Sequence, residues 1–233
     1  MKKSLITRRE AVGGGILAAA GVVLAKAGSV LADSGNRVTR KKKVPMPENK
    51  DFYDAQGKFL PEKARQAYYD MFKRFGYPNP KPQQELMWVQ DFGLGDFVHA
   101  GMAGVFWWNN KEASYFGHSI YLLPGQQIPE HKHVKTKDAV AKMEAWHCCY
   151  GMVYTVGEGP ETKPCPVKLP ESQEKFRTVK NVLPLMPGEV RELNRAEAFH
   201  FMIAGPEGAI VNEYATYHDG NALRFANPGV KLE

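Results

Sequence analysis

Apolar residues recur with helical spacing in one segment of the chain. Residues 60–78 read LPEKARQAYYDMFKRFGYP, in which Pro61 suits a first helical turn and Gly76 suits the position after a last one. The residues expected on one helical face are Ala64, Tyr68, Met71, Phe72 and Phe75. The pattern therefore predicts a helix that buries this face.

From residue 86 onward the pattern changes to short apolar or alternating runs, separated by glycine, proline and asparagine. The runs are MWVQDFG, GVFWWNN, SIYLLPG, MVYTVGEG, FRTVKNVLPLMPG, AFHFMIAG and AIVNEYATY. Many short strands at turn spacing are typical of an antiparallel sandwich or barrel. Residues 157–176 are expected to form a long surface excursion. The sequence thus predicts an all-β domain with an N-terminal helical segment, spanning residues 59–233.

The first 32 residues have the composition of an export signal. A charged start precedes a weakly hydrophobic run rich in glycine and alanine, and a small-residue site follows, so cleavage is expected after Ala32. The segment TRRE supplies the paired Arg8 and Arg9 of a twin-arginine (Tat) signal. We therefore expect export by the Tat machinery to the periplasm. A general secretory signal or an uncleaved anchor is the alternative, and no later segment resembles a membrane span.

The positive charge of the chain is concentrated before the domain. The formal net charge is +6, of which residues 1–43 contribute +8, so the remainder carries −2. Residues 33–58 are polar, basic and proline-bearing, and we interpret them as a linker or an arm. The charge gives no evidence for a nucleic-acid-binding face. Three cysteines, Cys148, Cys149 and Cys165, are too few for a disulfide scaffold.

Two histidines one residue apart, His131 and His133, follow the turn segment LPGQQIPE. Side chains alternate between the faces of a strand, so these imidazoles would point the same way and could bind one ion. The alternative is two surface histidines in a polar loop. Glu144 is the acid expected to join them, because it begins EAWHCCYGMVY, which reads as the next strand. Asp138 instead lies in a lysine-rich stretch that has the character of an insertion.

The same alternation sorts the residues that follow Glu144. The side chains expected on its face are those of Trp146, Cys148 and Tyr150, whereas His147 and Cys149 would face away and are disfavoured as ligands. The fourth ligand should come from a later strand. His200, which follows the Pro-Gly turn at 187–188, is the natural partner, and a core histidine between aromatic neighbours is the alternative.

These residues resemble the two motifs of a cupin. The first motif is represented by Gly125, His131, His133, Glu144 and Gly151, and the second by Pro187, Gly188 and His200. More narrowly, residues 86–233 resemble the D-lyxose isomerase family of cupin sugar isomerases. The segments that carry this resemblance are WVQDFGLGDFVHAGM (88–102), LLPGQQIPEHKH, KME (142–144) and VNEYATYHDGNALRFANP (211–228). The resemblance implies a cupin double-stranded β-helix, a jelly-roll barrel.

The chain departs from the family pattern around its acidic ligand. Eight residues separate His133 from Lys142, where the family has only a few. The family's glycine-rich run after the glutamate is here AWHCCYG, so Trp146 and Tyr150 are expected to narrow the cavity.

The resemblance implies a metal-dependent aldose–ketose isomerase that moves a proton through an enediolate. The expected metal ligands are His131, His133, Glu144 and His200, with Mn²⁺ as the expected ion and Zn²⁺, Fe²⁺ or Co²⁺ as alternatives. Lys142, in KME, would lie near the sugar oxygens. Glu213 is the preferred base, with the terminal Glu233 as a weaker candidate, and a surface strand acid is the alternative reading of Glu213. The residues expected to bind the substrate are Asp96 and Arg224.

Two other functions remain open from the residues alone. A mononuclear iron cupin dioxygenase would use the same ligands and favour an apolar cavity, for which Trp107, Trp108, Trp146 and Tyr150 are candidates. A periplasmic sugar-binding or storage cupin would hold a structural metal and catalyse nothing. The expected partners are a small sugar, the Tat machinery and a second copy of the chain in a homodimer.

Overall fold

The computed structural model describes residues 47–232. The predicted signal at 1–32, the first part of the arm at 33–58 and the candidate base Glu233 lie outside the described residues. Tat export and periplasmic localisation therefore stay predictions. Within residues 47–232, no helix has the length and apolar character needed to cross a membrane.

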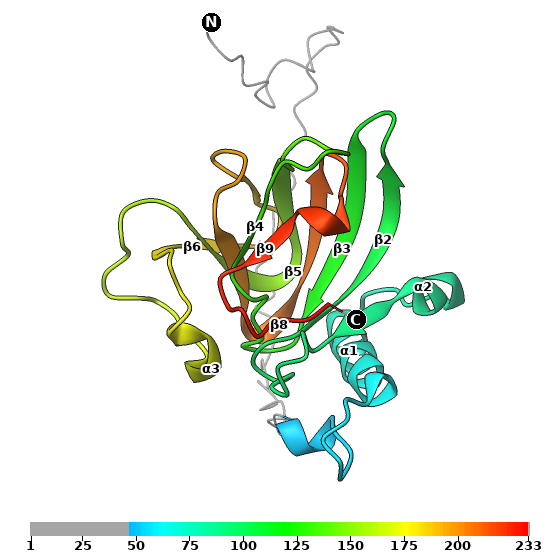
Figure 1. The fold of residues 1–233 in the computed structure, drawn as a ribbon. Coiled ribbons are helices and arrows are strands. Elements are labelled where there is room, and N and C mark those ends of the chain that lie inside the picture. Colours follow the sequence, from blue (N-terminus) through cyan, green and yellow to red (C-terminus); the bar gives the residue numbers. More distant parts are fainter. Residues whose placement is uncertain (1–46, 233) are drawn as a thin grey trace, which may run out of the picture. The chain divides into compact units, whose positions relative to one another are not determined.

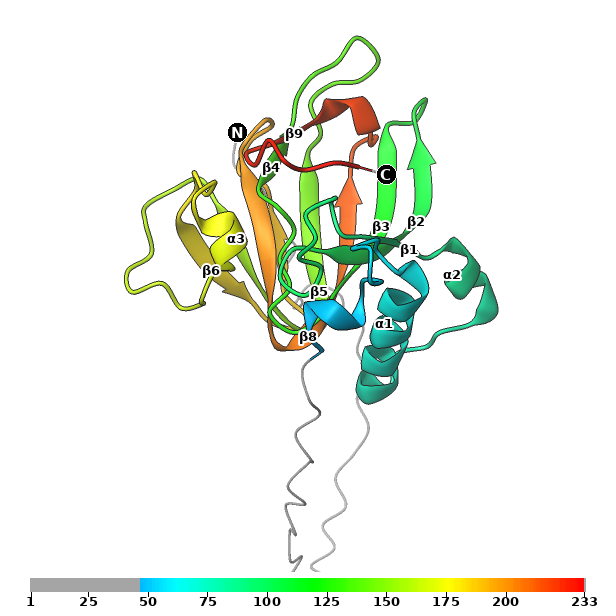
Figure 2. The ribbon, with the colours of Figure 1, turned by 60° about the horizontal axis from the view of Figure 1, so that its bottom comes forward.

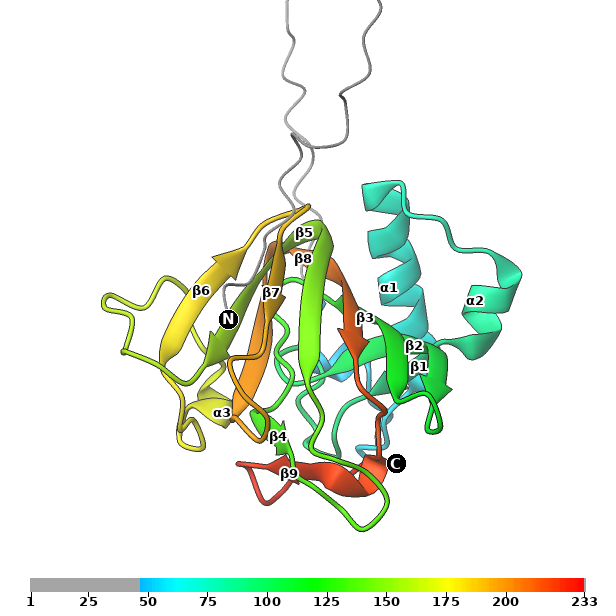
Figure 3. The same ribbon diagram turned by 90° about the horizontal axis from the view of Figure 1, so that it is seen from above.

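The strands form one curled antiparallel sheet (Figure 1). In chain order they are β1 (Trp88–Gln90), β2 (Met102–Asn110), β3 (Tyr115–Leu122), β4 (His131–His133), β5 (Glu144–Gly157), β6 (Asn181–Leu185), β7 (Val190–Glu192), β8 (His200–Ala215) and β9 (Leu223–Phe225). Seen from above, the strands surround a common interior (Figure 3). The predicted all-β, cupin-type barrel is confirmed.

Strand β8 is the element that joins the two ends of this barrel. Its second half pairs with β3 on one side and with the start of β5 on the other, from Ala209 to Ala215. Its first half pairs with the end of β5, and His200 lies opposite His131 of β4. The sequence pattern predicts separate strands for AFHFMIAG and AIVNEYATY, whereas in the structure both segments belong to one bent strand.

The bend arises from glycines that allow two backbones to approach closely. Gly151 of β5 has φ of 67° and Gly208 of β8 has φ of 85°, both in the left-handed region that favours glycine. A Cβ atom at position 151 would lie 2.9 Å from the carbonyl carbon of Gly208 and 3.2 Å from Cα of Ala209. The register shifts here, because Gly151 pairs with Ala209 and Val153 already pairs with Ala204. The bend carries both strands around the barrel.

The predicted helix is α1 (Pro61–Phe75), which ends at Gly76 in the left-handed conformation. It lies with the short helix α2 (Lys81–Leu86) beside β1 and β2 (Figure 2). The hydroxyl of Tyr68 donates a 2.6 Å hydrogen bond to Gln126, which lies in the turn before the histidine strand. Helix α2 was not predicted from the sequence, because six residues are too few to show a periodic pattern.

Two segments outside the barrel pack against it. Residues 47–58 contain a short 3₁₀ helix, η1 (Asn49–Asp51), and a buried Phe52 whose ring centroid lies 4.9 Å from that of Phe97. The surface excursion contains helix α3 (Glu171–Glu174), and buried Glu130 holds the chain directly after the excursion. The carboxylate of Glu130 accepts hydrogen bonds from the backbone N–H and the hydroxyl of Thr178. This anchor lies directly before the histidine strand.

The expected positions of several aromatic residues are wrong, and β-bulges explain why. The register of β5 against β8 shifts between Cys148 and Tyr150. Tyr150 consequently leaves the inner face and packs outside, with its ring centroid 5.8 Å from Phe75 and 5.6 Å from Tyr77. Tyr150 does not narrow the cavity, whereas Trp146 lines it as expected.

A second bulge, in β2 between Phe106 and Trp108, has a similar effect. Trp107 and Trp108 are exposed and lie outside the cavity lining, so they give no support to an apolar cavity. Phe106 and Trp88 line the cavity instead. The cysteines at 148, 149 and 165 are free.

The close approach at Gly151 generates a stability prediction. Gly151→Ala should lower the free energy of unfolding by at least ~2 kcal/mol, because the methyl group would collide with the β8 backbone at a positive φ. Chemical denaturation measures the change. The control is Gly117→Ala on β3, where an added Cβ would meet no described atom within 4 Å. Equal stability of the two variants would contradict this account of the bend.

Candidate active site

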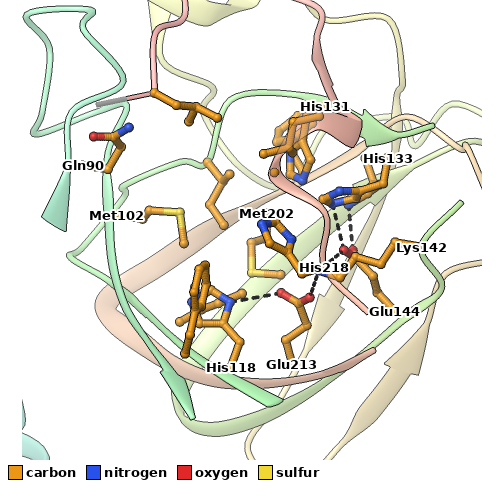
Figure 4. A pocket seen from close by; sticks show the side chains of 18 of the residues that line it. Gln90, Met102, His118, His131, His133, Lys142, Glu144, Met202, Glu213 and His218 are labelled. Atoms are coloured by element: carbon orange, nitrogen blue, oxygen red, sulfur yellow. Dashed lines mark hydrogen bonds and ion pairs between the residues drawn. The ribbon is translucent and has the colours of Figure 1, made fainter. Parts of the chain in front are cut away.

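The interior of the barrel contains a cavity of about 340 Å³ (Figure 4). Its polar lining residues are Gln90, His118, His131, His133, Lys142, Glu144, His200, Glu213 and His218. Figure 4 shows Gln90 and Met102 on the side of the cavity away from Lys142 and Glu144. Most of the other lining side chains are aromatic or aliphatic. The ionisable groups are therefore gathered in one region of a largely apolar cavity.

Three histidines from two neighbouring strands converge in that region. His131 and His133 lie on β4, His200 begins β8, and one ring nitrogen of each lies within 4.8 Å of the others. Nδ1 of His131 lies 2.9 Å from the carbonyl of Pro129, and Nδ1 of His200 lies 2.9 Å from the carbonyl of Ala198. A carbonyl accepts only, so each Nδ1 carries a proton, and in the neutral ring, the form that binds a metal, Nε2 presents a lone pair.

The carboxylate of Glu144 lies beside these rings. Its Oε1 is 2.9 Å from Nε2 of His133, and its Oε2 is 2.9 Å from Nε2 of His200. Burial would raise the pKa of Glu144, but Lys142 and the two histidines hold it well below its usual range. The carboxylate is therefore ionised inside the barrel.

The four side chains fit a divalent metal ion. Neutral imidazole nitrogens and a carboxylate are the ligands that such ions take from proteins. Nε2 of His200 is buried and makes no hydrogen bond to any described residue, although it lies near the carboxylate. Burial, followed by the neighbouring His200 and His133, holds the pKa of His131 well below its ordinary value and keeps that ring neutral. The backbone carbonyls already orient two of the rings, as they do in protein metal centres.

A buried lysine connects this cluster to a second carboxylate. Nζ of Lys142 lies 2.9 Å from Oε1 of Glu144 and forms a short ion pair with Oε1 of Glu213. It also lies 4.4 Å from the centroid of the Phe116 ring. Burial would lower the pKa of Lys142, but Glu144 and Glu213 outweigh it and raise that pKa. Lys142 is therefore a fixed ammonium between two carboxylates.

Glu213 is held ionised in the same way. Burial would raise its pKa, and Glu144 acts in the same direction, but Lys142 and His118 lower it overall. Its strand pairing places it opposite His118 of β3 and Trp146 of β5. An ionised carboxylate that faces a cavity can accept a proton from a bound molecule.

Two cavity histidines were missed by the sequence analysis. His118 lies with Nδ1 3.3 Å from Oε2 of Glu213. His218 stacks on Phe116, with ring centroids 5.2 Å apart, and burial, followed by the charge of Lys142, lowers its pKa to about 3. Each is a lone histidine in the sequence, and only the strand pairing brings His118 to Glu213.

The structure does not bring every expected residue to the cavity. Asp96 lies outside the lining, where its carboxylate accepts hydrogen bonds from Asn49 and Ser172. Arg224 is exposed and donates to the backbone carbonyls of residues 221 and 223. Asp138 is exposed and pairs with Lys111, with 3.2 Å between nitrogen and oxygen. Glu144, and not Asp138, therefore stands beside the histidines.

No family model matches the chain. The D-lyxose/D-mannose isomerase of Thermosediminibacter oceani is 31% identical over 167 residues, which cover 72% of this chain and 91% of that protein. The D-lyxose ketol-isomerase of Cohnella laeviribosi is 30% identical over 168 residues, which cover 72% of this chain and 91% of that protein.

Solved structures with a similar fold are L-ribose isomerases. The enzyme from Cellulomonas parahominis has a TM-score of 0.57 at 13% identity and covers 72% of this chain and 91% of its own. The enzyme from Acinetobacter sp. DL28, in complex with L-ribose, has a TM-score of 0.58 at 13% identity and covers 78% of this chain and 96% of its own. These likenesses establish the barrel fold, and the sequence relatives establish the family. The chain belongs to the D-lyxose isomerase family of cupin sugar isomerases.

Proposed function

We propose that the chain is a metal-dependent aldose–ketose isomerase that moves a proton between adjacent sugar carbons through an enediolate. The observation that carries this proposal is the Glu213 carboxylate, which is paired with Lys142 beside the histidine cluster in one cavity. The names of the relatives support D-lyxose and D-mannose as substrates to test first.

The metal would be held by His131, His133, His200 and Glu144, with Mn²⁺ as the expected ion. When bound, it supplies a Lewis acid for the sugar oxygens that gain negative charge during the reaction. The residues of the chain supply the remaining chemistry, which is proton transfer, charge stabilisation and exclusion of water.

Glu213 would remove the proton from the carbon next to the carbonyl and return it to the neighbouring carbon. Its carboxylate is ionised and faces the cavity, so it begins in the form that accepts a proton. The ammonium of Lys142 would stabilise the negative charge that develops on the sugar oxygens. The aromatic and aliphatic walls would limit the access of water to the carbanion-like intermediate.

The metal assignment predicts how ligand substitutions behave. Alanine at His131, His133, Glu144 or His200 should each weaken Mn²⁺ binding by more than ~100-fold, because three remaining ligands hold the ion far less tightly. Isothermal titration and metal analysis after dialysis measure the loss without reference to activity. Asp138→Ala is the matched control and should bind Mn²⁺ like the unaltered protein. Loss of metal in that control, with retention in Glu144→Ala, would refute the ligand set.

The proton-transfer route predicts isotope exchange with solvent. Isomerisation in D₂O should place deuterium at C1 or C2 of the product, because a proton carried on Glu213 can exchange with water, whereas a hydride shift cannot exchange. NMR of the product reads this directly. Glu213→Gln should abolish turnover while the metal stays bound. Absence of isomerisation of any pentose or hexose, with oxygen uptake by the Fe²⁺ form, would favour the iron dioxygenase instead.

The charge of the cavity predicts a preference for unphosphorylated sugars. Among the described residues that line the cavity, Lys142 is the only lysine or arginine, and it is already paired with two carboxylates. A phosphate would meet no lysine or arginine among the described lining residues on the Gln90 side. The kcat/KM for D-mannose should therefore exceed that for D-mannose 6-phosphate by at least ~100-fold. Gln90→Lys should lower the ratio of the two kcat/KM values. Equal kcat/KM for both sugars in the unaltered protein would contradict the predicted preference for unphosphorylated sugars.

A further inference from the structure

His118 is a buried cavity residue whose surroundings fix its ring. It lies on β3 directly opposite Glu213 of β8 and opposite Phe106 of β2. Its ring stacks on Trp88, with centroids 5.5 Å apart and an interplanar angle of 26°. Phe106 approaches from the edge, with its centroid 4.8 Å from that of His118. The imidazole is therefore clamped between aromatic rings and cannot turn freely.

The backbone of Gly104 makes room for this ring. A Cβ atom at position 104 would clash with Nε2 of His118 and would lie 2.8 Å from Cζ2 of Trp88 and 2.9 Å from the carbonyl oxygen of Ser119. Gly104 does not have a positive φ, so its conformation is open to any residue. The absence of a side chain thus gives room to the His118 ring, to Trp88 and to the backbone carbonyl of Ser119 together.

The two ring nitrogens of His118 have different environments. Nδ1 lies 3.3 Å from Oε2 of Glu213, while Oε1 of that carboxylate is held by Lys142. Nε2 is buried and has no hydrogen-bond partner within residues 47–232. An ionised carboxylate accepts only, so the proton of a neutral His118 belongs on Nδ1. The unpaired Nε2 then carries a lone pair, which is less costly to bury than an unmet N–H donor.

We propose that His118 is a positioning residue for Glu213: its neutral imidazole donates from Nδ1 to Oε2 and, with Lys142 on Oε1, fixes the carboxylate in the cavity. The proposal rests on the proposed role of Glu213 as the base. Gly104 contributes to the same arrangement, because its lack of a side chain permits the His118 ring to reach this position.

A neutral donor suits this task better than a charged one. Lys142 already lowers the pKa of Glu213, and a second positive charge would make the carboxylate a weaker base. Burial lowers the pKa of His118, which keeps the imidazole neutral at neutral pH in spite of the nearby Glu213. His118 can therefore orient the carboxylate while adding no full charge beside it.

A spectroscopic experiment tests the hydrogen bond independently of any isomerase activity. Two-bond ¹H–¹⁵N correlation spectra of the Zn²⁺-loaded protein report which nitrogen of each of the seven histidines carries the proton. The His118→Asn variant assigns the His118 signals by their disappearance. We expect a neutral ring protonated on Nδ1, and a shift towards the Nε2 tautomer in Glu213→Ala. An Nε2-protonated or doubly protonated ring in the unaltered protein would overturn the proposal.

A kinetic comparison tests positioning against mere packing. His118→Phe keeps an aromatic ring in the stack but has no donor, so kcat should fall about 10- to 100-fold while KM and Mn²⁺ content change little. His118→Asn has an amide N–H near the place of Nδ1 and should restore a substantial part of kcat. Gly104→Ala should lower kcat because the methyl group displaces the ring, whereas Gly117→Ala on the opposite face of β3 should not.

Three outcomes would reject the positioning role. They are an unchanged kcat in His118→Phe, an equal loss in His118→Asn and His118→Phe, and an unaffected kcat in Gly104→Ala. If the unaltered protein isomerises no aldose, the proposed function fails, and the tautomer spectra still decide whether His118 holds Glu213.

Discussion

A lysine buried between two buried carboxylates is the constraint on which the rest of the site depends. Lys142, Glu144 and Glu213 are 3%, 4% and 5% exposed. Removing each charge from water costs several kcal/mol, a cost that only close pairing offsets. With neutral histidines the trio carries one net negative charge. Burial opposes the charged form of His200, but Glu144 outweighs it and raises the pKa of that ring, so the cluster favours a positive charge at this place. The carbonyl-oriented rings of His131 and His200 lie where a cation would reduce the imbalance. Electrostatics and ligand geometry thus favour the same place for a metal ion.

The pairing of β5 with β8 brings these charges together. Glu144 lies opposite Ala215, and Glu213 lies opposite Trp146, so the two carboxylates are diagonal neighbours on the inner face of adjacent strands. Both strands then bend at Gly151 and Gly208, and β8 begins at His200, beside the histidines of β4. One strand therefore supplies a candidate metal ligand at one end and the candidate base at the other. The separation of these two roles along β8 depends on a bend that a non-glycine residue would oppose.

Local patterns allowed much of this arrangement to be predicted from the sequence. The helical spacing of residues 60–78 gave α1, and the alternation after Glu144 placed Glu144 and Trp146 on the inner face. The prediction for Tyr150 was wrong because a bulge reverses the alternation, and a bulge has no marker in a short apolar run. His118 was missed for a different reason. Its importance comes from a partner 95 residues away in the chain, and a single histidine in a strand carries no sign of that partner. The prediction that Asp96 lines the cavity was wrong, because the position of a residue in a motif does not fix the direction of its side chain.

Residues 134–141, the stretch between His133 and Lys142, contact the segment at the edge of the cavity and do not displace the candidate ligands. Val134 donates from its backbone to Ala222, and the hydroxyl of Thr136 donates a 2.7 Å hydrogen bond to Asp219. These contacts hold the short segment that carries His218, whose backbone also bonds to the side chain of Asn109 in β2. The extra residues before Lys142 therefore act on the wall that His218 contributes, at a distance along the chain from Glu144. A group on a sugar is recognised by the part of the cavity wall that it contacts. We therefore expect family members with different substrates to differ at such wall segments more than at their metal ligands. The proposed proton transfer at Glu213 and the wall that would meet the sugar thus lie in different parts of the same barrel.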